Sequence, residues 1–384
     1  MNLNECTRYA VSVIDQLPNL SLQKKRYWKK ELDRIRQKTA NPFLYVALIG
    51  DFSTGKSTFI NALVKKDILK TAWQATTAVP TYLFYHDGDE EQILVETLDK
   101  KRYRLDDEKQ RSEFEKRWNI RLPSEAKDRV AFLSANNALA GRLRRIAIRV
   151  SGFEGLRHIC LIDTPGVNPG AKEAAFHAKR TQEVLREEAD AAIILFQETQ
   201  IFSGSFQRFL LENAGRFMDD AVFVITMMDL AAQEERENLM EYVRAQLRRT
   251  FGLEEPPVFG CCARAVLSGK DDSESRYWTA SFDRMREQLL WYLSENRERI
   301  LRKQLARLLE HLIGELDAAV TADLSAIEQR KKCLEEKTAA DAAPYEERYR
   351  EYLFTKEKME IQIRRYTKAH ETLREYLKIM EKKG

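Results

Sequence analysis

One stretch constrains the fold of this chain more than any other, Gly50-Asp51-Phe52-Ser53-Thr54-Gly55-Lys56-Ser57. Two glycines separated by four residues and followed by Lys and Ser have the spacing of a phosphate-binding loop, a motif that is meaningful only between a strand and a helix. Both neighbours are present. The apolar run 43–49 before the loop is typical of a buried parallel strand, and residues 58–64 after it predict the opening of a helix.

A loop of this kind binds anions through its backbone N–H groups and through the positive end of the helix that follows. We expect Lys56 to reach the β- and γ-phosphates of a nucleotide and the Ser57 hydroxyl to bind Mg²⁺. The rest of the loop and the next residue are expected to line the phosphates: Gly50, Asp51, Phe52, Ser53, Thr54, Gly55 and Thr58.

Composition narrows the class of protein. The chain has 384 residues, 43% hydrophobic and 32% charged, which is typical of a globular protein of two or three domains with long charged helices. A net charge of +4 does not argue for a nucleic-acid partner. Cysteines are odd in number and lack metal-binding spacing, and neither a signal peptide nor a membrane span is visible. We therefore expect a cytoplasmic protein whose membrane contact, where it exists, is peripheral and at the inner membrane face.

Three segments differ in their patterns. Residues 42–272 alternate apolar runs with helical stretches, as in an α/β domain with a mostly parallel sheet and flanking helices. The predicted strands are 43–49, 79–85, 91–97, 145–150, 158–162, 191–196, 221–226 and 257–261. A charged segment, 98–140, is inserted between the third and fourth runs, and its pattern predicts helix but no function.

The flanking segments are helical. Residues 1–41 predict two amphipathic pieces that break at Pro18, and 273–384 predict two long helices, roughly 281–336 and 345–382. An amphipathic helix needs a partner face. We therefore expect the N-terminal helices to pack on the C-terminal bundle, together forming an all-α neck and partial stalk.

Further motifs complete a site for a guanine nucleotide. Asp163-Thr164-Pro165-Gly166 follows a predicted strand, where the Asp can hold Mg²⁺ through water and the Gly amide can sense the γ-phosphate. A switch segment between this motif and the loop needs a hydroxyl for Mg²⁺, and Thr77 is our first choice, with Thr76 as the alternative.

Base recognition is predicted at Thr226-Met227-Met228-Asp229, after another apolar run. The carboxylate of Asp229 can accept two hydrogen bonds from guanine, a donor pair that adenine does not present. Cys262-Ala263-Arg264 follows the last run and is placed to offer a backbone N–H to the base oxygen.

The loop, the segment 75–81 and the motif 163–168 resemble those of the bacterial dynamin-like GTPases. The resemblance implies a GTPase domain on a helical neck and stalk, GTP/GDP and Mg²⁺ as ligands, and dimerisation through the nucleotide face with itself or a related dynamin-like partner. It also implies that Ser53 positions water beside a monovalent cation, K⁺ or Na⁺, and that Thr77 positions the attacking water. Ser53, Lys56, Thr77 and Gly166 would then be the catalytic residues.

The chain departs from this family at Met227, where members usually carry Lys. A Met side chain can still pack on the purine but supplies no charge, so we expect GTP binding through Asp229 that is weaker and less base-selective. Family members also continue through a tip and return helices. We therefore expect a shortened chain, or one that a partner completes.

Two functions remain open. The first is a mechanochemical GTPase whose dimerisation moves a helical stalk to remodel or tether membranes. The second is a GTP-switched protein-interaction module without direct membrane binding. An RNA-associated GTPase fits poorly, because neither an RNA-binding module nor a basic surplus is visible.

Overall fold

A computed structural model describes the chain except for residues 1–2, 17–20, 41–42, 72–77, 89–90, 137–138, 140, 152–153, 168–171, 341–345 and 382–384. The chain forms two compact units. One unit is Phe43–Ile300, called here the sheet unit, and the other combines Met1–Pro42 with Leu301–Gly384, called the helical unit.

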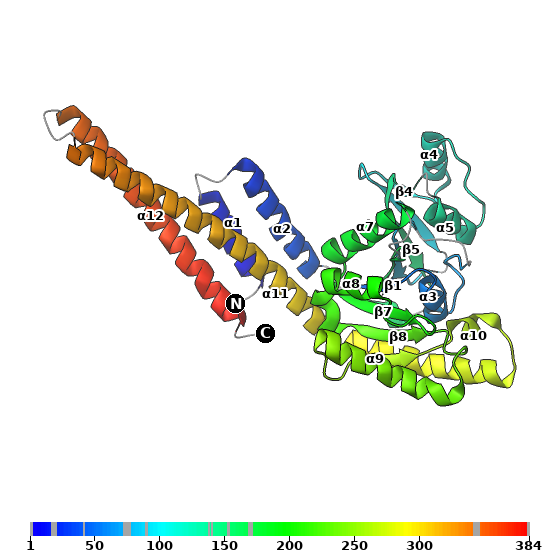
Figure 1. Cartoon of the computed structure of the whole chain (residues 1–384). Coiled ribbons are helices and arrows are strands. Elements are labelled where there is room, and N and C mark those ends of the chain that lie inside the picture. The colour runs from blue at the N-terminus through cyan, green and yellow to red at the C-terminus, as the bar shows by residue number, and fades with distance from the viewer. Residues whose placement is uncertain are drawn as a thin grey trace. The chain divides into compact units, whose positions relative to one another are not determined.

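The sheet unit is built on a nine-stranded sheet in the order β4-β3-β5-β2-β6-β1-β7-β8-β9 within the described residues (Figure 1). The strands are β1 Leu44–Gly50, β2 Thr81–Tyr85, β3 Gln92–Thr97, β4 Arg102–Arg104, β5 Leu143–Val150, β6 Ile159–Asp163, β7 Ala191–Gln197, β8 Val222–Thr226 and β9 Val258–Gly260. Every apolar run that the sequence singles out is one of these strands, so this part of the prediction is confirmed.

Most neighbouring strands run parallel. The chain of parallel pairs β6–β1–β7–β8–β9 forms one half of the sheet, and β2 pairs parallel with β5. Antiparallel pairs join β2 to β6 and join β3 to both β4 and β5. The carboxyl ends of β6, β1, β7, β8 and β9 therefore meet at a single edge of the sheet, where open α/β sheets bind their ligands.

Burial explains why these strands are so apolar. Every residue of β6 and β8 is buried, as are all but the final residue of β7, because helices cover the sheet on both faces. The helices of the sheet unit are α3 Lys56–Val64, α4 Glu108–Trp118, α5 Ala126–Ala135, α7 Lys172–Glu187, α8 Gly204–Asn213, α9 Arg236–Phe251 and α10 Ala263–Ser268. Short 3₁₀ helices lie at Glu154–Leu156, Gly215–Asp220 and Gln233–Glu235.

The predicted helical insertion is only partly helical. It holds α4 and α5 as expected, but it also holds β4, which the sequence analysis missed. Of the three residues of β4 only Tyr103 is buried, and both arginines are exposed. A single inward side chain gives no alternating pattern for a sequence to display.

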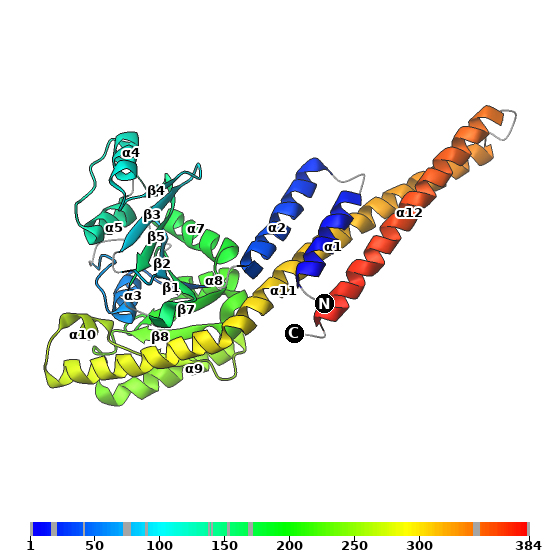
Figure 2. The same ribbon diagram turned by 180° about the vertical axis from the view of Figure 1, so that it is seen from behind.

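Helix α11, Ser273–Ala340, belongs to both units. Its first turns enter the core of the sheet unit, where Phe282 is fully buried with its ring 5.7 Å from that of Phe59. α9 and this part of α11 lie side by side in both views (Figures 1 and 2). The compact sheet unit therefore extends to residue 300, beyond residue 272 at which the sequence analysis ends the α/β domain.

The helical unit contains α1 Leu3–Gln16, α2 Leu22–Ala40, the later part of α11 and α12 Glu346–Glu381. Its core draws on all of these helices, with Ile14, Leu32, Leu309 and Tyr366 among its most buried members. Ser21 accepts the amide of Lys24 and so caps α2, as its position predicts. The predicted all-α bundle of N- and C-terminal helices is confirmed.

Candidate nucleotide site

The phosphate loop follows β1 and opens α3, and its backbone requires glycine at two positions. A Cβ atom at Gly50 would lie 2.5 Å from Thr54 Oγ1 and 3.1 Å from the carbonyl oxygen of Leu195. Gly55 has φ 80° at the start of α3, a left-handed backbone that glycine adopts without steric cost. Ser53 shares this conformation at φ 63° and its side chain is exposed.

Polar side chains fix the loop from within. The Asp51 carboxylate accepts the amide of Phe52 at 2.9 Å and the hydroxyl of Ser203 at 2.9 Å. Ser203 also caps α8 by accepting the amide of Phe206. The Thr54 hydroxyl donates to the Asp51 carbonyl at 2.9 Å. Asp51 thus joins the loop to the segment that follows β7.

Lys56 is buried, and its ammonium donates to the carbonyls of Gly50 at 3.0 Å and of Asp51 at 2.9 Å. Burial lowers the pKa of Lys56 to about 8, opposed by the charges of Asp163 and Asp51. Burial removes water from the Lys56 ammonium, which two carbonyls hold in the loop. Phosphate oxygens bound in the loop would replace that water as hydrogen-bond acceptors.

Ser57 and Asp163, both expected at Mg²⁺, are brought together from the start of α3 and the end of β6. Ser57 Oγ donates to Asp163 Oδ2 at 2.9 Å, and Asp163 is 1% exposed. A hydroxyl and a carboxylate are the hard oxygen donors that Mg²⁺ prefers, and Mg²⁺ takes few protein ligands beside substrate phosphates. These two residues therefore fit a magnesium ion.

Gly166 lies directly against the phosphate loop. A Cβ atom there would lie 3.1 Å from Phe52 Cα and 3.4 Å from Lys56 Nζ. The next residue, Val167, donates its amide to the Gly50 carbonyl at 3.2 Å. On the other side of the motif, the buried hydroxyl of Thr181 in α7 donates to the Pro165 carbonyl at 2.8 Å.

The base motif also reaches the loop. The Thr226 hydroxyl at the end of β8 donates to the Thr54 carbonyl at 2.8 Å. Met227 has φ 60°, and its Cε lies 3.9 Å from the position that a Cβ would take at Gly55. The methionine side chain therefore runs beside the loop, where it can support a bound base by apolar contact.

Asp229 and Cys262 meet at the far end of this motif. Asp229 is exposed, and Cys262 precedes α10, whose first residues are Ala263 and the exposed Arg264. Burial raises the pKa of the Cys262 thiol to about 12, helped by its hydrogen bond to the Asp229 carboxylate. The thiol therefore lies beside the carboxylate that is predicted to bind guanine.

The two switch threonines, Thr76 and Thr77, lie outside the described residues, so their predicted role stays a prediction. Thr58 lies in the first turn of α3 and is half-buried. Two contacting residues were missed by the sequence analysis, Ser203 and Thr181. The Ser203-Gly204 pair does signal a helix start, but nothing in the local pattern points to Asp51 as its partner.

No helix within the described ranges combines the length and apolar character needed to cross a bilayer. In the same part of the chain, no group of three or more His, Cys, Asp or Glu side chains could hold a metal.

Comparisons with known proteins identify a family rather than individual site residues. The model of the "Dynamin family" matches residues 46–228, which span the phosphate loop, Asp163 and the start of the base motif. This match confirms the family resemblance drawn from the motifs. "Dynamin-like protein 1" of Campylobacter jejuni is 26% identical over 259 residues, covering 62% of this chain and 35% of that protein.

Two other matches are more distant. An uncharacterised protein from the xynA 3′ region of a Caldicellulosiruptor species is 22% identical over 310 residues, covering 80% of this chain and 71% of its own. A solved structure of an oligomerised bacterial dynamin pair is 17% identical with a TM-score of 0.48, covering 88% of this chain and 50% of that one. The chain thus spans about a third of the Campylobacter protein and half of the solved one.

Proposed function

We propose that this chain, whose residues 46–228 belong to the dynamin family, binds GTP with Mg²⁺ and hydrolyses it to GDP and phosphate. The observation that carries the proposal is the 2.9 Å contact of Ser57 Oγ with Asp163 Oδ2, beside the buried ammonium of Lys56. The hydroxyl and carboxylate oxygens that would bind Mg²⁺ therefore lie beside the ammonium that would bind phosphate. All three groups are at the carboxyl edge of the sheet, where a nucleotide is expected.

Each residue has a distinct task in this proposal. Lys56 would bind the β- and γ-phosphates, and the amides of the loop would surround them. Ser57 would bind Mg²⁺ directly and Asp163 through water, and the ion would neutralise phosphate charge. Phosphoryl transfer needs little covalent help from protein, so catalysis is chiefly positioning and charge stabilisation.

The attacking water is assigned by the family resemblance. Thr77 would hold it, with Ser53 beside a monovalent cation and the Gly166 amide sensing the γ-phosphate. The exposed side chain of Ser53 and its left-handed backbone are compatible with such a contact, because the hydroxyl is open to a ligand.

Base recognition is proposed at Asp229, with Cys262-Ala263-Arg264 supplying a backbone donor. The Asp229 carboxylate is exposed and lies beside the Cys262 thiol, so it would be open to the paired donors of guanine. Met227 would pack on the purine without adding charge.

Binding of labelled GTP to the chain and to the Lys56→Ala variant tests the site. We expect the unaltered chain to bind and the variant to lose most affinity, since the variant removes the only predicted side-chain cation for the phosphates. Retained binding in the variant would refute the site assignment, provided that circular dichroism shows both proteins to be equally folded.

We further propose that the sheet unit pairs with another copy, or with a related dynamin-like protein, across its nucleotide face. Hydrolysis would then be slow in the monomer and faster in the dimer. Turnover per molecule should rise with protein concentration in the presence of GTP. A flat dependence would contradict this part of the proposal.

The helical unit would pass the nucleotide state to a membrane or to a protein partner. The family resemblance favours peripheral membrane remodelling or tethering from the cytoplasm. Sedimentation with anionic liposomes in GTP and in GDP separates the alternatives. Pelleting with a change in turnover supports membrane action, whereas neither response would favour a GTP-switched interaction module.

A further inference from the structure

We propose that Thr181 is a positioning residue for the Gly166 amide, so that its hydroxyl sets how strongly the site distinguishes GTP from GDP. The inference rests on the proposed function. It concerns a residue of α7 that is remote from the phosphate loop in sequence and that belongs to none of the motifs described above.

The geometry starts from the peptide bond between Pro165 and Gly166. The Thr181 hydroxyl donates to the Pro165 carbonyl at 2.8 Å, and Thr181 is fully buried. The structure has no cis peptide bond among its described residues. In a trans peptide the C=O and the following N–H point in opposite directions. The carbonyl that Thr181 holds therefore directs the Gly166 N–H away from α7.

Gly166 also lies against the phosphate loop. Phe52 Cα and Lys56 Nζ would lie 3.1 Å and 3.4 Å from a Cβ atom placed on Gly166. The peptide bond before Gly166 is thus held by Thr181, and Gly166 itself is in close contact with the phosphate loop. Turning the plane would break the Thr181 hydrogen bond and leave a buried carbonyl without its donor, which is costly.

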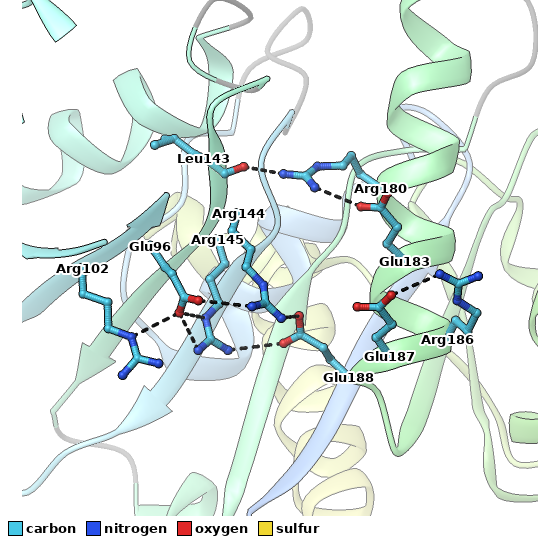
Figure 3. Close-up of polar contacts among 10 residues, drawn as sticks. All are labelled: Glu96, Arg102, Leu143, Arg144, Arg145, Arg180, Glu183, Arg186, Glu187 and Glu188. Atoms are coloured by element: carbon cyan, nitrogen blue, oxygen red, sulfur yellow. Dashed lines mark hydrogen bonds and ion pairs between the residues drawn. The ribbon is translucent and has the colours of Figure 1, made fainter. Parts of the chain in front are cut away.

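Thr181 can hold this plane because α7 is itself fixed. Its neighbour Arg180 donates to the carbonyl of Leu143 on β5 (Figure 3). At the end of the helix Glu188 forms ion pairs with Arg145 at 3.3 Å and Arg144 at 3.6 Å, both also on β5. Two anchors on one strand therefore hold α7 in place against β5.

The anchor on β5 is reinforced from the next strand. Glu96 on β3 is only 2% exposed and pairs with Arg145 at 2.9 Å and with Arg144 at 3.3 Å (Figure 3). Arg145 is therefore shared by Glu96 and Glu188, so that β3, β5 and the end of α7 form one network. Because Glu96 is buried, removing its arginine partners would leave a buried carboxylate without compensation and destabilise the protein.

The consequence is specific to one nucleotide. In the proposed function the Gly166 amide senses the γ-phosphate, so its orientation should matter for GTP and not for GDP. A loosened peptide plane should weaken GTP binding and slow turnover, and leave GDP affinity as it is. A residue that merely stabilises the fold would affect both nucleotides alike.

The test compares Thr181→Val, which keeps the shape and removes the hydroxyl, with Thr181→Ser, which keeps the hydroxyl. Affinities for GDP and for a non-hydrolysable GTP analogue are measured with kcat and KM for GTP. For Thr181→Val we expect the ratio of the two affinities to fall about three- to tenfold, the range of one neutral hydrogen bond, with kcat also reduced. Thr181→Ser should restore both values.

An unchanged affinity ratio in a folded Thr181→Val variant would overturn the inference, as would equal losses for both nucleotides. Thr181→Ala removes the same hydroxyl with less bulk and replaces the valine variant should that one fail to fold. Failure of the unaltered chain to bind either nucleotide would instead overturn the proposed function and this inference with it.

Discussion

The hydroxyl of Thr226 donates a hydrogen bond to the carbonyl of Thr54 over 2.8 Å, which joins the base motif to the phosphate loop. The same hydroxyl lies 3.1 Å from the carbonyl of Phe196 on the neighbouring strand β7. Thr226 is 3% exposed, so its single hydroxyl hydrogen is shared between two carbonyls in a site that is closed to water, with the shorter contact to Thr54. The two halves of the candidate site are therefore parts of one buried network.

Replacing Thr226 with Val should disturb both halves together. We expect GTP affinity to fall about three- to tenfold and the free energy of unfolding to fall by about 1 kcal/mol, since one buried hydroxyl donor is lost. Nucleotide binding and urea denaturation measure the two effects. Thr226→Ser keeps the donor and serves as the control. Normal affinity in Thr226→Val would mean that the network does not shape the loop.

The pKa of Lys56 predicts how GTP affinity depends on pH. Burial lowers this pKa to about 8 in the nucleotide-free protein. Phosphates bind the protonated form of Lys56, so nucleotide binding raises its pKa. At a pH above about 8, where the free group is mostly deprotonated, binding of the nucleotide therefore takes up a proton. Affinity should therefore fall about threefold between roughly pH 7.5 and 8.5 through this group.

Calorimetry in buffers of different ionisation enthalpy measures that proton uptake. In Lys56→Arg the guanidinium stays charged throughout this range, so the proton uptake assigned to Lys56 should vanish. Uptake of the same size in the variant would show that another group titrates.

The contact of Ser57 with Asp163 predicts a dependence on Mg²⁺. In Ser57→Ala the hydroxyl ligand is gone while Lys56 and the loop amides remain. We expect turnover to require much higher Mg²⁺ concentrations, and GDP binding in EDTA to stay close to that of the unaltered chain. A titration of Mg²⁺ against GTP turnover measures the shift. An unchanged Mg²⁺ requirement would remove Ser57 from the magnesium site.

Replacing Met227 with Lys should strengthen nucleotide binding at the candidate site. Lys and Met are both unbranched, so Met227→Lys should keep the left-handed backbone and the packing beside Gly55. The added ammonium should strengthen GTP binding and raise the ratio of GTP to ATP affinity. Competition between the two nucleotides measures that ratio. Met227→Leu adds no charge and should leave the ratio where it is.

The packing of Phe282 predicts that the start of α11 belongs to the folded core of the sheet unit. Its fully buried ring packs against Phe59, so Phe282→Ala should lower the free energy of unfolding by about 3 kcal/mol. Trp291→Ala, at a side chain that is 66% exposed on the same helix, should cost little. Guanidinium denaturation followed by circular dichroism compares them. Equal effects would place the start of α11 outside the folded core.

Much of the fold could be predicted from the sequence because its central strands are buried on both faces. A strand such as β6 or β8 is then apolar at every position, and the run stands out without any alternation. β4 could not be predicted in this way. Its pattern offers one buried tyrosine between two arginines, which a loop displays as readily.

Some residues of the candidate site could likewise be predicted from the sequence, and others could not. Ser57 and Asp163 could both be assigned to Mg²⁺ from their motifs, but the parallel pairing of β1 with β6 that brings them together is known only from the structure. Thr181 lies in helix α7, and Ser203 is the N-cap residue of helix α8. Their contacts depend on how those helices cross the sheet, which no local spacing records.

The two outermost strands of the sheet, β4 and β9, are each three residues long. Short edges offer few unpaired backbone groups, and the exposed arginines of β4 resist the approach of a further strand. Neither edge is a template for β-augmentation or fibril growth. Self-association of the sheet unit is therefore expected through side-chain surfaces rather than through these two edges, and amyloid-specific dyes should stay dark even in concentrated solutions that contain GTP.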